Sequence, residues 1–269
     1  MVIENEKLGN LSGEKYTNQF GITAIKDGMK KTSDASLNSR LRKPEWLKVQ
    51  LPTGKHYKTL LQDVKAHGLN TVCQESKCPN IGECWNRSTA TLMILGNICT
   101  RACRFCAVDT GNPKGWIDPL EPNNVAETVS LMALDYVVLT SVNRDDLPDG
   151  GARHIVHCVT QTKAKNPKVL IEVLSPDFSG STASLDVLLQ STLDVFSHNI
   201  ETVKRLTSLV RDPRASYHQS LDVLMHAYEN NIITKSGMML GLGETDDEII
   251  TTLRDLRSVG VSLMTLGQY

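Results

Sequence analysis

The chain has 269 residues, of which 40% are hydrophobic, and this is enough for one sizeable core with small appendages. Its 29 Lys and Arg residues balance 30 Asp and Glu residues, and the formal net charge of −1 gives no electrostatic case for nucleic acid or an anionic membrane as a partner. The acidic N-terminus lacks the apolar core of a secretory signal, and no stretch approaches the ~20 apolar residues of a membrane span. We therefore expect a soluble protein of a reducing compartment, the cytoplasm or, in a eukaryote, an organellar matrix or stroma.

The first predicted element is an N-terminal extension over residues 1–40. This segment is polar, with scattered Gly, Ser and Lys, and such a composition predicts a mobile chain. Six of the seven cysteines follow it within a short distance, at Cys73, Cys78, Cys84, Cys99, Cys103 and Cys106. Clustered cysteines without a secretory signal, in a chain too large to need covalent staples, favour metal binding over disulfides.

The cysteines form two triplets with different spacing. Cys99, Cys103 and Cys106 make a compact C-x3-C-x2-C loop, short enough to place three thiolates around one face of a [4Fe–4S] cluster. Three thiolates leave one of the four irons open to a ligand that the protein does not supply. The other triplet, C-x4-C-x5-C, is too widely spaced to be a copy of the first and is also one ligand short. The spacing therefore predicts two iron–sulfur clusters.

Two other metal-binding classes fit the cysteines less well. Structural zinc takes four Cys or His ligands, and the nearest histidines outside the stretch, His56 and His67, are not at zinc-finger spacing. A two-cluster electron carrier would have four cysteines per cluster in a far shorter chain. The seventh cysteine, Cys158, lies in an apolar run and is expected to be a packed core thiol.

Helix and strand patterns alternate from the second triplet to the end of the chain. Asn123 or Asn124 is the expected N-cap of one helix, a second helix runs from Ser216 to Glu229, and Thr245 or Asp246 caps a third that ends at Gly260. Buried strands are predicted at residues 90–95, 136–141, 168–174, 194–198, 232–240 and 262–266. Six strands joined by right-handed crossovers predict an α/β fold, a partial (β/α)6 TIM-like barrel over residues 90–269.

Polar residues follow four of these strands, where a parallel barrel carries its functional groups. Each set alone is ordinary turn chemistry, but four such ends beside a cysteine loop predict a ligand site. The ends are Ser141, Asn143 and Asp145 after the second strand, Ser175 and Asp177 after the third, Asn199 and Glu201 after the fourth, and Gly241 after the fifth.

The cysteine loop, with Phe105 before its last cysteine, resembles that of the radical S-adenosylmethionine superfamily. The longer segments "CQESKCPNIGECW", "TSVNRDDLPDGGA", "HNIETV", "VRDPRASYHQSL" and "KSGMMLGLGET" resemble those of lipoyl synthases. The recognisable segments run from about Lys43 to Tyr269, outside the N-terminal extension. The resemblance also implies that residues 41–89, between the mobile segment 1–40 and the barrel, form a second N-terminal extension, which would bind an auxiliary cluster.

This resemblance implies an enzyme that replaces two unactivated C–H bonds of an octanoyl chain with C–S bonds. The [4Fe–4S] cluster on Cys99, Cys103 and Cys106 would bind and reductively cleave S-adenosylmethionine, and those three cysteines would be the catalytic ones. A second [4Fe–4S] cluster, on the first triplet, would donate the sulfur. The implied acceptor is an octanoyl-lysine on a lipoyl carrier domain or H protein, and an external electron donor such as ferredoxin or flavodoxin would reduce a monomeric enzyme.

The resemblance also implies the contacts of S-adenosylmethionine. The methionyl group would lie at the end of the second strand. The ribose and adenine would lie at Asn199 and Glu201 or at the Met239-to-Gly243 segment. Arg211 and Lys235 could each meet a carboxylate or be a solvated charge at the barrel rim. For Lys235 the carboxylate contact is slightly favoured over the solvated charge. The full set of expected cofactor-binding residues is Phe105, Ser141, Asn143, Asp145, Asn199, Glu201, Lys235, Met239 and Gly241.

The family pattern departs from this sequence at the C-terminal end. Lipoyl synthases continue past the sixth strand to a final helix and an Arg-Ser-Ser-Tyr segment, whose serine completes the auxiliary cluster. Here the sequence stops at Tyr269, and the internal residues 214–217 resemble that segment only superficially. The expectation is an auxiliary cluster without its fourth ligand. An impaired cluster-binding fragment and a radical enzyme with another substrate therefore stay open as alternatives.

Overall fold

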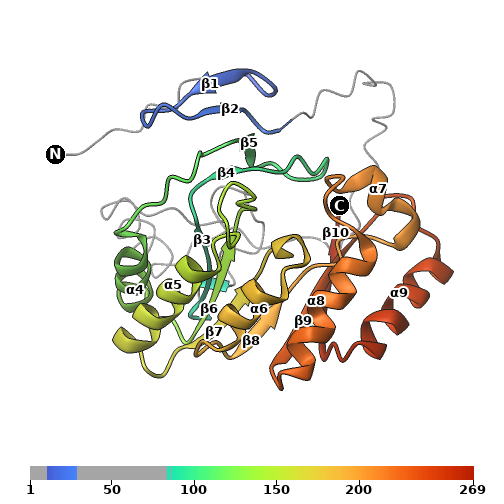
Figure 1. The fold of residues 1–269 in the computed structure, drawn as a ribbon. Coiled ribbons are helices and arrows are strands. Elements are labelled where there is room, and N and C mark those ends of the chain that lie inside the picture. The colour runs from blue at the N-terminus through green and yellow to red at the C-terminus, as the bar shows by residue number, and fades with distance from the viewer. Residues whose placement is uncertain (1–10, 29–83, 86) are drawn as a thin grey trace.

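The computed structural model describes residues 11–28, 84–85 and 87–269, and its centre is a six-stranded sheet in which every neighbouring pair is parallel (Figure 1). The strand order is β10-β9-β8-β7-β6-β3, so strands adjacent in sequence are adjacent in the sheet. The strands are β3 Thr89–Ile94, β6 Tyr136–Ser141, β7 Leu170–Leu174, β8 Val195–Ser197, β9 Ile233–Leu240 and β10 Leu263–Gln268. All six predicted strands are present, with ends shifted by two residues at most.

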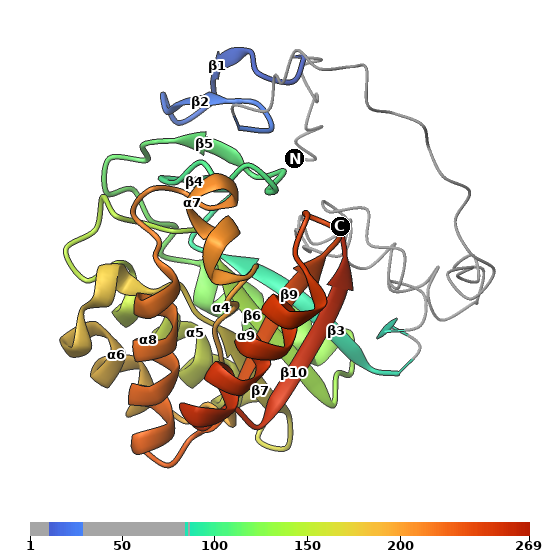
Figure 2. The ribbon, with the colours of Figure 1, turned by 90° about the vertical axis from the view of Figure 1, so that its right-hand side faces the viewer.

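Crossover helices connect these strands and pack side by side along the sheet (Figures 1 and 2). They are α4 Glu121–Leu131, α5 Ala152–Lys165, α6 Thr182–Leu189, α8 Tyr217–Glu229 and α9 Asp246–Ser258, with the short α7 Thr207–Val210 and the 3-10 turns η3 Phe178–Gly180 and η4 Lys204–Leu206. Side chains such as Leu139, Ile171 and Leu188 are fully buried between the two layers. In the described part of the chain, no helix is both long and apolar enough to cross a bilayer.

Capping side chains explain where two of these helices begin. The Ser216 hydroxyl accepts a hydrogen bond from the Gln219 N–H at 3.1 Å, at the predicted start of α8. At α9, Thr245 accepts from the Glu248 N–H at 3.3 Å and Glu248 accepts from the Thr245 N–H at 2.9 Å. This reciprocal pair satisfies two N–H groups that the helix cannot pair internally, and it confirms Thr245 as the cap.

The predicted N-cap of α4 was wrong. The helix begins at Glu121, so Asn123 and Asn124 lie within its first turn and not before it. Pro122 explains the earlier start, because a proline ring presets the helical φ and its missing N–H costs nothing in the first turn.

A second, four-stranded sheet lies above the barrel in Figure 1, in the order β1-β2-β5-β4. Its strands are β1 Lys15–Thr17, β2 Thr23–Ile25, β4 Ile98–Cys99 and β5 Asp109–Gly111. Residues 11–28 fall in the predicted mobile extension but form a hairpin, and its β2 pairs antiparallel with β5. The hairpin buries Ile22 and Ala24 against Ile98, a small apolar cluster that the polar composition of the segment conceals.

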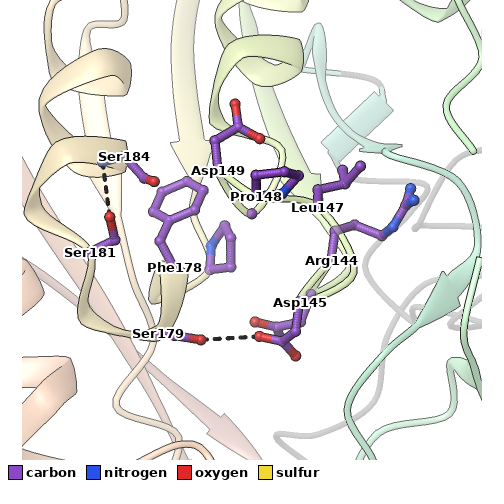
Figure 3. Close-up of a pocket in the computed structure, with 12 residues that line it drawn as sticks. Arg144, Asp145, Leu147, Pro148, Asp149, Phe178, Ser179, Ser181 and Ser184 are labelled. Carbon is purple, nitrogen blue, oxygen red and sulfur yellow. Dashed lines mark hydrogen bonds between the residues drawn. The ribbon is translucent and has the colours of Figure 1, made fainter. Parts of the chain in front are cut away.

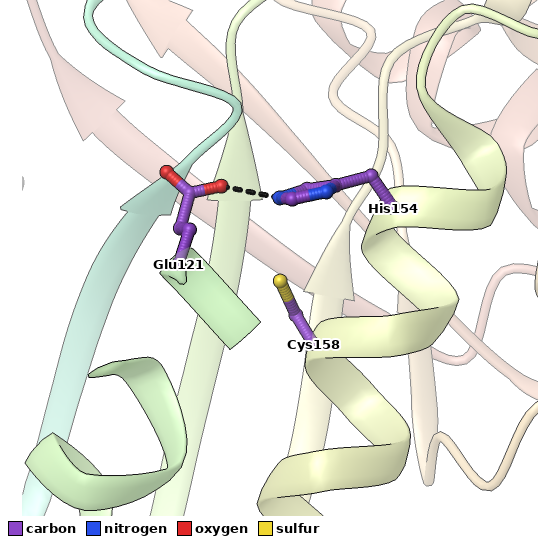
Figure 4. A group of neighbouring side chains, drawn as sticks. All are labelled: Glu121, His154 and Cys158. Carbon is purple, nitrogen blue, oxygen red and sulfur yellow. Dashed lines mark hydrogen bonds and ion pairs between the residues drawn. The ribbon is translucent and has the colours of Figure 1, made fainter. Parts of the chain in front are cut away.

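The turn after β3 is fixed by a junction of α4 and α5 (Figure 4). The Glu121 carboxylate accepts hydrogen bonds from the N–H groups of Leu95 at 2.8 Å and Gly96 at 3.3 Å, and His154 Nε2 lies 2.7 Å from it. Cys158 is fully buried beneath this pair, and burial raises the pKa of its thiol. The ligand atoms of Glu121, His154 and Cys158 lie within 4.8 Å of one another, but the carboxylate already serves the backbone. We interpret the group as structural, with Cys158 the packed core thiol that its sequence context predicts.

Candidate functional site

The cysteine loop lies at the carboxyl end of the parallel sheet. β3 leads through the Leu95–Gly96 turn into β4, which ends at Cys99, and β5 begins at Asp109 after Cys103 and Cys106. All three cysteine side chains are partly exposed, and none of them forms a disulfide. Burial raises the pKa of Cys99 and of Cys103. Iron binds the thiolate, so loading a cluster here requires these thiols to lose their protons.

The carboxyl end of β6 holds the beginning of this loop. The Thr100 N–H donates to the Asn143 carbonyl at 3.0 Å, and the Thr100 hydroxyl donates to Asp145 at 2.7 Å. Burial disfavours a charge on Asp145, but hydrogen bonds from Arg101 and Thr100 outweigh it and lower the pKa to about 2. Asp145 was predicted to contact S-adenosylmethionine, and this contact stays a prediction. In the structure its oxygens accept hydrogen bonds from Thr100 and Arg101 of the cysteine loop.

Arg101, inside the loop, is almost fully buried, a position that arginine takes only when paired. Its guanidinium reaches Asp145 and Asp177, each at 2.8 Å, and Ser179 at 3.0 Å. It thereby ties the ends of β6 and β7 to the loop. We did not single out Arg101 from the sequence. The only signal was its pairing potential with two aspartates that follow predicted strands.

A small pocket opens beside Asp145, between the loops that follow β6 and β7 (Figure 3). Its volume is about 190 Å³, below the roughly 300–1,000 Å³ of typical small-molecule sites. The lining includes Asn143, Asp145, Leu147, Phe178, Ser179 and Ser181. A pocket of this size is too small for the whole of S-adenosylmethionine.

The ends of β8 and β9 are joined around Asn199 and Glu201. The Glu201 N–H donates to the Gly237 carbonyl at 3.0 Å, and the Met239 N–H donates to the Glu201 carbonyl at 2.9 Å. Glu201 has φ +68°, a left-handed conformation that is uncommon outside glycine and often marks functional sites. Burial raises the pKa of its carboxyl group.

Lys235 and Arg211, the two cationic side chains that could bind the carboxylate of S-adenosylmethionine, have different hydrogen-bond partners. The Lys235 amine pairs with Glu172 at 2.8 Å, and Tyr136 donates to the same carboxylate at 2.7 Å. Arg211 is 8% exposed and donates through Nη1 to Ser220 at 2.7 Å, while its buried Nε has no partner in the described chain. Arg211 is therefore the better placed of the two to receive a carboxylate.

The other predicted contacts differ in what they offer. The Ser141 hydroxyl is buried and has no hydrogen-bond partner among the described residues. A bound ligand could supply the missing hydrogen bond. Phe105 packs against the core, and Met239 lies on β9 beside β10. Gly241 adopts φ +107° and donates its N–H to Glu244.

Of the other cysteine triplet, only Cys84 is described. Cys84 is partly buried and packs against the main core. Cys73 and Cys78 lie outside the described residues, so the second cluster stays a prediction.

Comparison with known proteins agrees with this site. The model of the radical SAM superfamily matches residues 93–256, and that of the N-terminal domain of lipoyl synthase matches residues 14–78. A lipoyl synthase of Marinobacter nauticus is 54% identical over 269 residues, which cover 99% of this chain and 77% of the relative. The chain belongs to the lipoyl synthase family. The match from residue 14 shows that the lipoyl synthase pattern begins earlier than the motifs near Lys43 indicate.

Further lipoyl synthases and distant structures extend the comparison. A lipoyl synthase of Legionella pneumophila is 56% identical over 96% of this chain and 78% of its own length. Methylornithine synthase (PylB) has a TM-score of 0.56 at 15% identity, over 81% of this chain and 61% of its own. SuiB of Streptococcus suis, bound to S-adenosylmethionine, has a TM-score of 0.52 at 8% identity, over 81% and 47%. These two structures support the partial barrel fold.

Membership of the radical SAM superfamily implies a [4Fe–4S] cluster and S-adenosylmethionine. The residues present fit both groups. Three thiols on one short loop suit a cluster with one open iron, and the buried Ser141 hydroxyl and Arg211 Nε are polar atoms without described partners.

Proposed function

We propose that this chain is a lipoyl synthase, which inserts two sulfur atoms into the octanoyl chain of an octanoyl-lysine on a lipoyl carrier domain or H protein. The observation that carries the proposal is the three-cysteine loop at the carboxyl edge of the barrel, in a chain 54% identical to a lipoyl synthase. A C–H bond of an alkyl chain offers no acidic proton, so acid–base groups alone cannot activate it at neutral pH.

The cysteine loop of residues 99–106, called the cluster loop from here on, would place its cofactor at the open end of the barrel. When bound, the cluster supplies the electron for reductive cleavage of S-adenosylmethionine. The protein's own contribution is to fix the reactants and to exclude water from the interior of the barrel, its lumen. Arg101 and Asp145 hold the loop to the sheet, and the contacts described above support a positioning role for both.

The side chains around the lumen would bind S-adenosylmethionine. Ser141 and Asn143 would meet the methionyl group, and Arg211 would take its carboxylate in place of Lys235, whose amine is paired with Glu172. Asn199, Glu201 and the Met239-to-Gly241 segment would meet the ribose and adenine.

The domain organisation follows from this assignment. Residues 41–89 would bind the auxiliary cluster through Cys73, Cys78 and Cys84, and residues 90–269 would form the catalytic barrel. The auxiliary cluster would provide the sulfur atoms, and ferredoxin or flavodoxin would supply electrons. We infer a cytoplasmic monomer.

Two measurements test the proposal. Anaerobic reconstitution should load about eight irons per chain, four for each cluster. With dithionite, S-adenosylmethionine and octanoylated carrier, mass spectrometry should detect two sulfur atoms added to the carrier. A carrier that stays unmodified while 5′-deoxyadenosine forms would favour a radical enzyme with another substrate.

Single-cysteine variants separate the two clusters. Cys103→Ser should abolish the formation of 5′-deoxyadenosine, whereas Cys84→Ser should retain it and lose sulfur insertion. Cys158→Ala is the matched control, because this thiol belongs to the core, and it should retain both activities. Sulfur insertion by the Cys84→Ser variant would contradict the role of the first triplet.

A further inference from the structure

The segment 210–214, which runs from the last residue of α7 toward α8, lies directly against the cluster loop although more than a hundred residues separate them in sequence. The Arg104 N–H donates to the Val210 carbonyl at 2.9 Å. Arg214 Nη2 donates to the Thr100 carbonyl at 2.7 Å. The loop is thus held at positions before and after Cys103 by one distant segment.

Asp212 makes the central contacts of this segment. Its backbone N–H donates to Cys103 Sγ at 3.3 Å, and its carboxylate accepts from the Ala102 N–H at 2.9 Å. Asp212 is 4% exposed, so these contacts lie away from water. One residue therefore holds Cys103 by its sulfur and by the backbone amide that precedes it.

Arg214 fixes the orientation of Asp212. Its Nε donates to Asp212 at 2.8 Å, and its backbone N–H donates to the same oxygen at 3.0 Å. Its Nη1 also reaches Asp145 at 3.2 Å, which connects the segment to the end of β6. The carboxylate consequently has a single orientation, with one oxygen toward Ala102.

The hydrogen bond to sulfur differs from the one at the neighbouring ligand. Cys99 Sγ accepts from the Arg101 N–H at 3.4 Å, within the same turn of chain. Cys103 Sγ instead accepts from Asp212, more than a hundred residues away in the sequence. The environment of the cluster would then depend on how the segment 210–214 packs.

We propose that Asp212 is a positioning residue for the cluster: it fixes the cluster loop around Cys103 and donates an N–H to that ligand's sulfur. The inference rests on the cluster of the proposed function, but not on the identity of the substrate. A hydrogen bond to a ligand sulfur stabilises the added negative charge of the reduced cluster and so raises its reduction potential.

Pulsed EPR tests the hydrogen bond directly in the chain of 269 residues. Replacing Cys73, Cys78 and Cys84 by Ala leaves only the Cys99 loop to bind a cluster, which dithionite reduces to its paramagnetic state. With [15N]aspartate labelling we expect a 15N coupling to the cluster that disappears in Asp212→Ser. [15N]Arginine labelling, which reports the Arg101 N–H, is the positive control. A coupling from arginine without one from aspartate would overturn the proposal.

Reduction potentials test the role of the carboxylate. Asp212→Asn and Asp212→Leu both remove the negative charge, but only Asn keeps an oxygen for the Ala102 N–H. We expect a lower potential in Asp212→Leu than in Asp212→Asn, and loss of the cluster from a folded Asp212→Leu chain alone would support the same role. Equal potentials in the two variants would overturn it. Glu127→Gln, a change on an exposed side chain of α4, is the control and should leave the potential unchanged.

Neither measurement requires the octanoylated carrier. Failure of sulfur insertion would therefore leave this inference intact, and its own failure would leave the proposed reaction intact.

Discussion

His198 is a fully buried histidine whose charge the fold controls. Its Nδ1 lies 2.9 Å from the Ser175 carbonyl oxygen, which can only accept, so we assign the proton to Nδ1. The Ser220 hydroxyl lies 2.9 Å from Nε2 and also accepts from Arg211. Burial, and then the nearby charge of Arg211, lower the pKa of His198 to about 4. The ring is neutral in the native state, and the network sets the position of Arg211.

This lowered pKa predicts a pH-dependent stability. An unfolded histidine titrates near pH 6.5, so between pH 6.5 and about 4 the unfolded chain binds a proton that the native chain does not. Stability should therefore fall as the pH falls through this window, by about 2 kcal/mol at pH 5. Urea unfolding of the reduced, cluster-free chain at pH 7 and pH 5 would measure it. His198→Asn should remove most of the difference, and an unchanged difference would contradict the assignment.

Gly237 leaves the space that Asn199 occupies. A Cβ at position 237 would lie 2.6 Å from Asn199 Oδ1, so Gly237→Ala must displace that side chain. If Asn199 contacts S-adenosylmethionine, we expect at least a tenfold weaker affinity, about 1.4 kcal/mol. Equilibrium dialysis on the reconstituted chain measures this.

Gly267→Ala is the matched control for that substitution. Gly267 lies on the neighbouring strand β10, and a Cβ there meets no atom within 4 Å. We expect its affinity for S-adenosylmethionine to match that of the unmodified chain. Equal affinities in both alanine variants would remove Asn199 from the predicted binding residues.

At the scale of elements, the junction of α4 and α5 fixes the turn that delivers the cluster loop. Glu121→Gln removes the charge that two backbone amides and His154 share. Hydrogen bonds to charged groups contribute roughly 1.5–3 kcal/mol, so we expect a loss of about 1–3 kcal/mol in urea unfolding. Glu127→Gln on the same helix is exposed and should stay within about 0.5 kcal/mol of the unmodified chain. A similar small change for both variants would mean that the junction does not hold the turn.

The strands were predictable from the sequence because each is a short apolar run between polar turns. The buried faces of the helices were less predictable than the strands. In α8, Leu224, Met225 and Tyr228 recur at a spacing of one helical turn or less, but Met225 and Tyr228 are exposed while Val223 and Ala227 are buried. Periodicity gives the existence of a helix, whereas the buried face depends on how it packs on its neighbours.

The candidate site was predictable only in part, for a similar reason. The spacing of Cys99, Cys103 and Cys106 is local and directly readable. Arg101 and Asp212 act through contacts to distant segments, which no local pattern encodes. The pairing of Lys235 with Glu172 joins β9 to β7, the two strands on either side of β8, and no local pattern encodes it either.

At the scale of the whole molecule, the N-terminal hairpin and the cluster loop share one small sheet. Asp109 of β5 joins them: it accepts from the Tyr16 hydroxyl at 2.6 Å and from the Asp27 N–H at 2.9 Å. β5 also pairs with β4, which ends at Cys99. The hairpin thus covers a strand edge beside the cluster loop, which would otherwise leave N–H and C=O groups unpaired.

The hairpin should therefore detach when Asp109 is lost. In Asp109→Ala, the hydrogen bonds from Tyr16 and Asp27 disappear together with the ion pair with Lys26. The apolar contact of Ile22 and Ala24 with Ile98 is too small to hold the hairpin alone. Hydrogen–deuterium exchange should rise at least tenfold in residues 15–25 and stay unchanged in β6 and β7. Tyr16→Phe removes only the bond from the tyrosine hydroxyl and should give an intermediate rise. Unchanged exchange in residues 15–25 of Asp109→Ala would show that strand pairing alone holds the hairpin in place.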